Sequence, residues 1–209
     1  VWIAFINSRY GLYKIDLKKS TMPLSKQPVI QTDRMIQGVT AWENREIFFS
    51  GHENIYNINE IKGDKASQID IDLSTYTIIR DIDSHSKNEG VFSFIGSNAI
   101  LDSSKIADLC IYDLNKNKYI KKLEVYYDRD AFVGNRYSQW ASSKERLYFL
   151  KKNGDEISLF YFDFLNGNVR SAGLNEKKIK SFAISNDGRF CVILRDTESD
   201  QITVYKLND

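Results

Sequence analysis

The sequence predicts an all-β protein built from repeated sheets, and three observations lead to this fold class. A short phrase of apolar and aromatic residues that closes on a polar residue occurs five times in the 209 residues. The phrases follow one another at intervals of about 43 to 54 residues, a period typical of proteins that repeat a small sheet. Only two prolines and no long helical periodicity interrupt the pattern. The phrases are Leu12-Tyr13-Lys14-Ile15-Asp16, Ile55-Tyr56-Asn57-Ile58-Asn59, Leu109-Cys110-Ile111-Tyr112-Asp113, Leu159-Phe160-Tyr161-Phe162-Asp163 and Ile202-Thr203-Val204-Tyr205-Lys206.

These repeats predict a β-propeller of about five four-stranded blades, either a small complete ring or part of a larger one. A chain of this length with 42% hydrophobic residues can bury one sizeable core, so we expect a single domain over residues 1–209. The expected blades cover approximately residues 1–33, 34–75, 76–130, 131–175 and 176–209.

Each repeat is interpreted as an inner strand, a second strand, the signature phrase and an outer strand. The second strands are short aliphatic and aromatic runs at Trp2–Ile6, Ile47–Ser50, Val91–Ile95, Leu147–Lys151 and Phe190–Leu194. Inner strands precede four of them, at Val39–Trp42, Ile78–Asp83, Tyr137–Ala141 and Ile179–Ile184. Outer strands follow four of the phrases, at Pro28–Gln31, Gln68–Ile71, Tyr119–Val125 and Asn168–Ala172.

Asn, Asp and Gly supply turns between the predicted strands, as in Asn153-Gly154 and Asn186-Asp187-Gly188.

The two end repeats are incomplete in complementary ways. The first repeat lacks an inner strand and the last lacks an outer strand. An open sheet edge exposes unpaired main-chain groups. Because the chain also begins at Val1 inside a strand pattern, we favour a piece of a larger ring over a closed five-bladed one.

Several segments resemble known propeller repeats. Ile179 to Phe190, with the turn Ser185-Asn186-Asp187-Gly188 and the following Ile202 to Tyr205, resembles the repeats of WD-repeat and TolB-like propellers. The first repeat, Trp2 to Asp16, is similar to propeller repeats in the sensor regions of bacterial hybrid histidine kinases. The resemblance covers nearly the whole chain, and it implies a sensory or interaction module of a larger bacterial regulator.

The charge balance argues against a generally basic or acidic partner. The 29 basic and 28 acidic residues give a net charge of +1, so no nucleic-acid partner is expected. Lysine clusters at 116–122 and 177–180 are interpreted as guards of exposed strand edges. No apolar run is long enough to cross a bilayer, and the compartment is left open. We expect Cys110 and Cys191 to act as small core residues.

Candidate catalytic and metal-binding residues are few. Alternation in a strand would place Asp81, Asp83 and His85 on one face, a set that could bind a divalent metal. We favour a strand that ends in a solvated turn, because other repeats lack matching acidic residues. His52, within Ser50-Gly51-His52-Glu53, is interpreted as part of a tight turn. We therefore expect no catalytic residue, no metal and no cofactor, and the protein is predicted not to be an enzyme.

The connector between the third and fourth blades is the predicted partner-binding site. It spans residues 126–137 and is rich in Tyr and Arg, which are enriched at the energetic centres of protein interfaces. The alternative is that its aromatic rings cover the junction between blades. The predicted binding residues are Tyr126, Tyr127, Arg129, Arg136 and Tyr137.

The sequence as a whole predicts a non-catalytic recognition or sensory domain that binds a protein or peptide. Rigid blades would hold the connecting loops and reduce the ordering cost of binding. Two alternatives stay open. The first is a degenerate propeller hydrolase of the lactonase or peptidase kind, and the second is a freestanding scaffold of the WD-repeat kind.

Overall fold

The computed structural model describes residues 2–5, 10–14, 30–32, 34–52, 55–63, 65–98, 105–128, 136–141, 143–176, 179–195 and 201–207. These residues form five separate antiparallel sheets, and the strands of each sheet follow one another in chain order. The prediction of an all-β chain of repeated sheets is confirmed. The middle three sheets have four strands each, and the first and last have three strands within the described residues.

The strands have the following bounds. The first sheet contains β1 (Trp2–Phe5), β2 (Tyr10–Lys14) and β3 (Ile30–Thr32). The second contains β4 (Met35–Ala41), β5 (Glu46–His52), β6 (Ile55–Lys62) and β7 (Lys65–Ile69). The third contains β8 (Ile78–Ser84), β9 (Val91–Ser97), β10 (Ile106–Asp113) and β11 (Lys118–Tyr126). The fourth contains β12 (Ser138–Ala141), β13 (Arg146–Asn153), β14 (Glu156–Asp163) and β15 (Asn168–Glu176), and the fifth contains β16 (Ile179–Ile184), β17 (Phe190–Arg195) and β18 (Gln201–Lys206).

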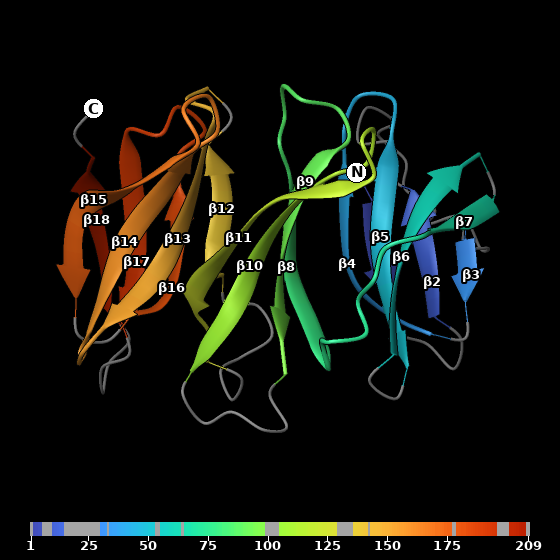
Figure 1. The fold of residues 1–209 in the computed structure, drawn as a ribbon, viewed down its shortest axis with the longest axis horizontal. Helices are drawn as coiled ribbons and strands as arrows, with labels where there is room; N and C mark the ends of the chain where they lie inside the picture. Colours follow the sequence, from blue (N-terminus) through green and yellow to red (C-terminus); the bar gives the residue numbers. More distant parts are fainter. Residues whose placement is uncertain are drawn as a thin grey trace, which may run out of the picture.

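The sheets stand side by side, and consecutive first strands of the last four sheets contact one another. Strand β4 contacts β8, β8 contacts β12, and β12 contacts β16. In Figure 1 the sheet β16–β18 lies at one end of the row and the sheet β1–β3 lies toward the other. The described residues therefore form an open row of sheets, with a hydrophobic core between each sheet and the next.

Burial of the second strands follows from this arrangement. All seven residues of β9 are buried, because neighbouring sheets cover both faces of this strand. A strand covered on both faces is expected to be apolar throughout rather than alternating. Strand β17 differs, because its buried Cys191 and Ile193 alternate with exposed residues. Cys110 and Cys191 are both buried free thiols, as the sequence predicted.

The turns use the residues that the sequence indicated. Gly154 has a φ of 63° in the turn between β13 and β14, a conformation that glycine adopts without steric cost. In the turn between β16 and β17, the Asp187 carboxylate accepts hydrogen bonds from the Ser185 hydroxyl at 2.6 Å and the Arg189 N–H at 3.1 Å. Such a side-chain bond to a main chain two residues on fixes the turn locally.

One outer strand begins earlier than the sequence predicted. We expected the outer strand of the second sheet at residues 68–71, whereas β7 covers Lys65–Ile69. The reason is a tight turn at Gly63, which has a φ of 67° and lets Lys62 pair with Lys65. The residues after β7 then enter the core, where Leu73 and Tyr76 are buried.

Within the described residues, no helix has the length and apolar character that a bilayer crossing by a helix requires.

Candidate functional site

The three tyrosines of the predicted partner-binding connector are buried within the described residues. Tyr126 is 8% exposed, Tyr127 2% and Tyr137 3%. Of the two predicted arginines, Arg136 is exposed, and Arg129 lies outside the described residues. The structure thus leaves Arg136 as the accessible member of the set among the residues it describes.

The tyrosines pack against one another at the junction between the third and fourth sheets. The Tyr137 ring lies 5.9 Å from that of Tyr126 and 5.5 Å from that of Tyr127, measured between centroids and both edge-on. The Tyr137 hydroxyl donates to the Asp128 carbonyl oxygen at 3.3 Å. Burial raises the pKa of Tyr127. This agrees with the alternative interpretation, in which the aromatic rings of the connector cover a blade junction.

Asp81 and Asp83 connect the first strands of two sheets. The Asp81 carboxylate accepts the N–H groups of Tyr137 at 2.5 Å and Ser138 at 3.2 Å. The Asp83 carboxylate accepts the N–H of Trp140 at 2.9 Å, and the Arg136 guanidinium lies 3.9 Å from Asp83. Both carboxylates of β8 therefore satisfy main-chain donors of β12, which would otherwise face the interior without a partner.

A bulge in β8 makes this arrangement possible. The register between β8 and β9 shifts between Arg80 and Asp83, and Asp81 has a φ of 51°. A bulge places two residues opposite one and redirects the side chains. Burial raises the pKa of Asp81 to about 6, against the lowering effect of the two N–H donors and the Arg136 charge. Burial raises the pKa of Asp83 as well, partly offset by the Trp140 N–H.

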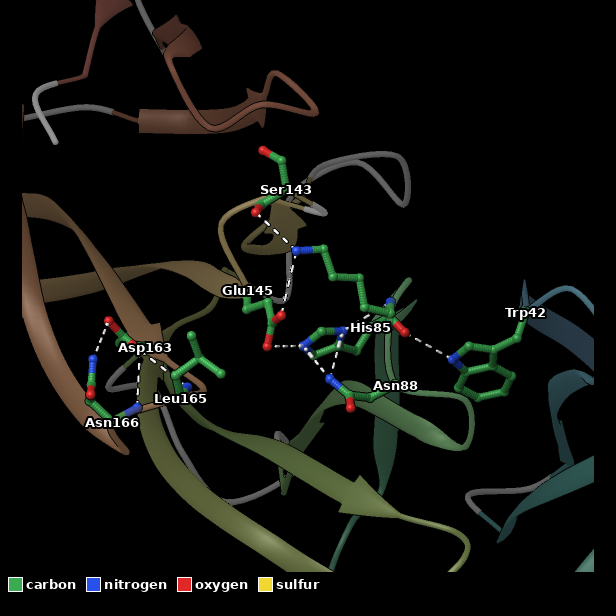
Figure 2. A network of polar contacts seen from close by, with 9 residues as sticks. Trp42, His85, Asn88, Ser143, Glu145, Asp163, Leu165 and Asn166 are labelled. Atoms are coloured by element: carbon green, nitrogen blue, oxygen red, sulfur yellow. Dashed lines mark hydrogen bonds and ion pairs between the residues drawn. The ribbon is translucent and has the colours of Figure 1, made fainter.

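His85 lies at the centre of a second polar network, at the other end of the same junction (Figure 2). Its ring is 1% exposed, and its Nε2 atom lies 3.0 Å from the Asn88 amide nitrogen and 3.9 Å from the Glu145 carboxylate. The ring also packs 4.5 Å from Trp140 and 4.7 Å from Phe164, between centroids. The carbonyl of His85 accepts the Trp42 indole N–H at 3.0 Å.

This network joins three sheets through their first turns. Lys87 donates to the Ser143 carbonyl at 3.2 Å and pairs with Glu145 at 3.4 Å. Burial lowers the pKa of His85, and the nearby Glu145 charge raises it by a smaller amount. Asp81, Asp83 and His85 are thus held apart in separate contacts. Among the residues that the structure describes, no three His, Cys, Asp or Glu residues are placed to hold a metal ion.

The first lysine cluster lies on the outer edge of the third sheet. Lys116, Lys118, Lys121 and Lys122 are exposed on or next to β11, the outer strand. Lys122 lies 4.4 Å from the centre of the Tyr119 ring and donates to the Tyr76 hydroxyl at 3.2 Å. Lysine on an outer strand discourages pairing with another sheet edge.

The last sheet carries an exposed apolar surface that the sequence analysis did not single out. Its exposed side chains are Phe190 at 42%, Val192 at 37%, Ile202 at 71% and Val204 at 63%. Val192 lies directly opposite Val204, and Leu194 lies opposite Ile202. We call the four exposed side chains, all on one side of β17 and β18, the open face.

The corresponding positions in the preceding sheets are core positions. In the fourth sheet, Tyr148 and its partner Tyr161 occupy the positions of Val192 and Val204. Leu150 and its partner Leu159 occupy the positions of Leu194 and Ile202. Those four side chains are between 0% and 8% exposed. The open face therefore has the composition of a buried sheet junction, and it is uncovered within the described residues. Comparing the repeats position by position would have found this signal in the sequence.

Comparisons with known proteins identify the fold. No family model matches the chain, and no curated protein matches it. Among solved structures, TolB from Acinetobacter baumannii is similar over 98% of this chain and 49% of its own, with 13% identity and a TM-score of 0.65. An oligogalacturonate lyase in complex with manganese covers 95% of this chain and 58% of its own, with 10% identity and a TM-score of 0.68.

A third similar structure is the β-propeller domain of the Trilobed protease from Pyrococcus furiosus. It covers 98% of this chain and 64% of its own, with 11% identity and a TM-score of 0.60. The chain has the β-propeller fold, as its repeats predicted. It spans about half to two thirds of the length of the solved structures that it matches.

Proposed function

We propose that this β-propeller is a non-catalytic recognition domain that binds a protein partner through the open face of its last sheet. The observation that carries the proposal is that Val192, Ile202 and Val204 are exposed at positions that are buried core in the preceding sheet, and that the exposed Phe190 adjoins them on the same side of β17. Contiguous exposed apolar residues on a rigid scaffold mark interaction sites. We keep the predicted binding of a protein or peptide, and we assign it to the open face rather than to the connector.

The chemistry of this surface favours an apolar, sheet-forming partner. Within the described residues, strand β18 is the outer strand of a three-stranded sheet, whereas the middle sheets place a fourth strand at this position. A partner strand can add to such an edge by main-chain hydrogen bonds, while its side chains cover the apolar face. Burial of each valine or isoleucine contributes about 1.5 to 3 kcal/mol to such a contact.

The state of the ionisable groups supports a non-catalytic function. His85, Asp81 and Asp83 are each held in contacts that join neighbouring sheets. Burial raises the pKa of Cys110 to about 11 and that of Cys191 to about 12, which keeps both thiols protonated and poorly nucleophilic at neutral pH. The resemblance of the first repeat to propellers of hybrid histidine kinases supports a place in a larger bacterial regulator.

The test compares lysine substitutions in the full-length natural protein. Val204→Lys and Ile202→Lys place a charge on the open face, and Leu165→Lys is the control because Leu165 is 72% exposed in the turn between β14 and β15. We expect the wild type and the control to copurify with a partner in constant stoichiometry, and the two test variants to bind it at least about tenfold more weakly.

The proposal fails if the open-face variants retain the partner with unchanged affinity while their folding is intact. It also fails if the open face is covered by a further sheet of the same chain, since the surface would then be a blade junction. Light scattering gives the mass of each purified protein and so shows whether the partner is bound. Circular dichroism shows whether each variant is folded, so that a loss of binding is distinguished from misfolding.

A further inference from the structure

A cavity of about 180 Å³ lies between the first and second sheets. Its walls come from β3, from the bend at Arg34 and from β5, β6 and β7. The polar lining residues are Gln31, Thr32, Arg34, Ser50, Asn57 and Asn59, and the apolar ones are Ile30, Phe48 and Ala66. A volume of this size holds about six water molecules or an organic molecule of similar bulk.

The polar lining departs from the apolar pattern of the third and fourth sheets. In the third sheet, the second strand is β9, and Phe92 and Phe94 lie on its face toward the second sheet. Both rings contact Phe49 of β5, which identifies this face. Their partners in β10 are Tyr112 and Cys110. In the fourth sheet the same face carries Leu147 and Phe149, with Phe162 and Phe160 as partners.

In the second sheet this face carries hydrophilic residues instead. Phe48 packs with Ile30 of the first sheet, so its side chain lies on the face of β5 that is turned toward the first sheet. Ser50 lies two residues further along the same side and is paired with Asn57, while Phe48 is paired with Asn59. Three positions that hold aromatic, aliphatic or thiol groups in the third and fourth sheets therefore hold one hydroxyl and two amides here.

The polar groups are already oriented around the cavity. The Asn59 amide donates to the Ser50 hydroxyl at 3.0 Å, and Ser50 is only 2% exposed. The Asn57 amide lies 2.8 Å from the Arg34 guanidinium and accepts a hydrogen bond from it in the orientation that turns the amide oxygen toward Arg34. The Thr32 hydroxyl accepts the Arg34 main-chain N–H at 3.1 Å, which holds the bend beside the cavity. A preformed hollow with a few convergent polar groups is the usual form of a small-molecule site.

We propose that this cavity binds a small hydroxy-carboxylate. The described lining contains one cationic group, Arg34, and no acidic residue. The guanidinium fork matches a carboxylate, which it can bind through two parallel hydrogen bonds. The amides of Gln31, Asn57 and Asn59 both donate and accept, which suits the hydroxyl groups of the same ligand. Phe48 and Ile30 supply an apolar base for its carbon chain.

The proposal is independent of the open face, which belongs to a different sheet. The test is calorimetric titration of the protein with glycerate and gluconate, with glycerol as the uncharged comparison. We expect saturable binding of at least one acid and at least about tenfold weaker binding of glycerol, since the carboxylate contact with Arg34 would be missing.

Two variants of the cavity and one control decide the result. Arg34→Gln removes the charge but keeps a donor, and Asn59→Leu places an apolar side chain at a position that is apolar in the third and fourth sheets. Both are expected to weaken acid binding at least about tenfold, whereas Arg170→Gln, on the exposed strand β15, leaves it unchanged. The proposal is overturned if neither acid binds the wild type, or if Arg34→Gln binds as the wild type does.

Discussion

The Asp83 carboxylate accepts the main-chain N–H of Trp140 at 2.9 Å, although the two residues belong to different sheets. Asp81 does the same for Tyr137 and Ser138. Gln139 of β12 repeats this pattern at the next junction, because its amide both accepts from the Ile184 N–H and donates to the Ile184 carbonyl. Side chains that bind the main chain of the next first strand therefore connect the sheets in succession.

Removing the Asp83 carboxylate is expected to weaken the junction between the third and fourth sheets. Asp83→Ala should lower the free energy of unfolding by about 1.5 to 3 kcal/mol, because the Trp140 N–H loses a charged acceptor. Asp70→Ala is the matched control, since Asp70 is exposed just after β7. Urea denaturation measures both variants. Equal stability of the two would show that the Asp83 contact contributes nothing.

Asp81 is expected to make stability fall as pH rises through the mildly acidic range. Burial raises its pKa from 3.8 to about 6, so in this range the folded state holds a proton that the unfolded state has released. The contribution is complete below about pH 4 and is lost as pH rises through about 6. Relative to Asp81→Asn, the wild type should lose about 2 kcal/mol between about pH 4.5 and pH 7.

The comparison with Asp81→Asn is necessary because other carboxylates act in the opposite direction. The pKa of Asp113 and that of Asp163 are lowered by their turn contacts, so these groups stabilise the fold as pH rises. They are present in both proteins and cancel in the difference. Urea denaturation at several pH values gives the curve, and a flat difference would contradict the buried, ionisable position of Asp81.

Glu145 is expected to support the protonated form of His85. Burial lowers the pKa of His85 and the Glu145 charge, 3.9 Å away, raises it. Glu145→Gln should therefore lower the pKa of His85 further, as followed by NMR of the imidazole ring. Glu156→Gln, at an exposed position on β14, is the control. A His85 pKa that is the same in the wild type and Glu145→Gln would show that the two groups do not interact.

The buried tyrosines of the connector are expected to respond differently to loss of the hydroxyl. The Tyr127 hydroxyl is buried with no hydrogen-bond partner among the described residues, so Tyr127→Phe should be neutral or slightly stabilising. Tyr137→Phe loses the bond to the Asp128 carbonyl and should cost about 0.5 to 1.5 kcal/mol. Thermal and urea denaturation measure the two changes, and the reverse order would contradict the placement of these side chains.

The fold could be predicted from the sequence because each repeat carries its own strand and turn signals. The phrase around Leu159, for example, predicts a strand whose apolar residues fill both sides of a sheet, and β14 has this form. The early start of β7 could not be predicted from the sequence, because Lys65 and Ser67 are polar and the turn at Gly63 sets the register.

The candidate sites depended on information that a single repeat does not contain. Tyrosine is common in interfaces and in cores, so composition alone could not decide whether Tyr126 and Tyr137 would be exposed. The positions of Asp81 and Asp83 depend on a bulge, which breaks the simple alternation used to place them on one face. The cavity and the open face depend on cross-strand pairs, such as Ser50 with Asn57 and Val192 with Val204, that differ in composition or burial from the pairs of other sheets.

The most direct test of the recognition proposal is photo-crosslinking from the open face of the full-length protein in its source cells. Benzoylphenylalanine would replace Val204 in one sample and Leu165 in the control, both of which are exposed. We predict crosslinks from position 204 to a second polypeptide, mapped by mass spectrometry to an apolar strand, and none from position 165. Crosslinks from position 204 only within its own chain, or none above the control, would contradict the account.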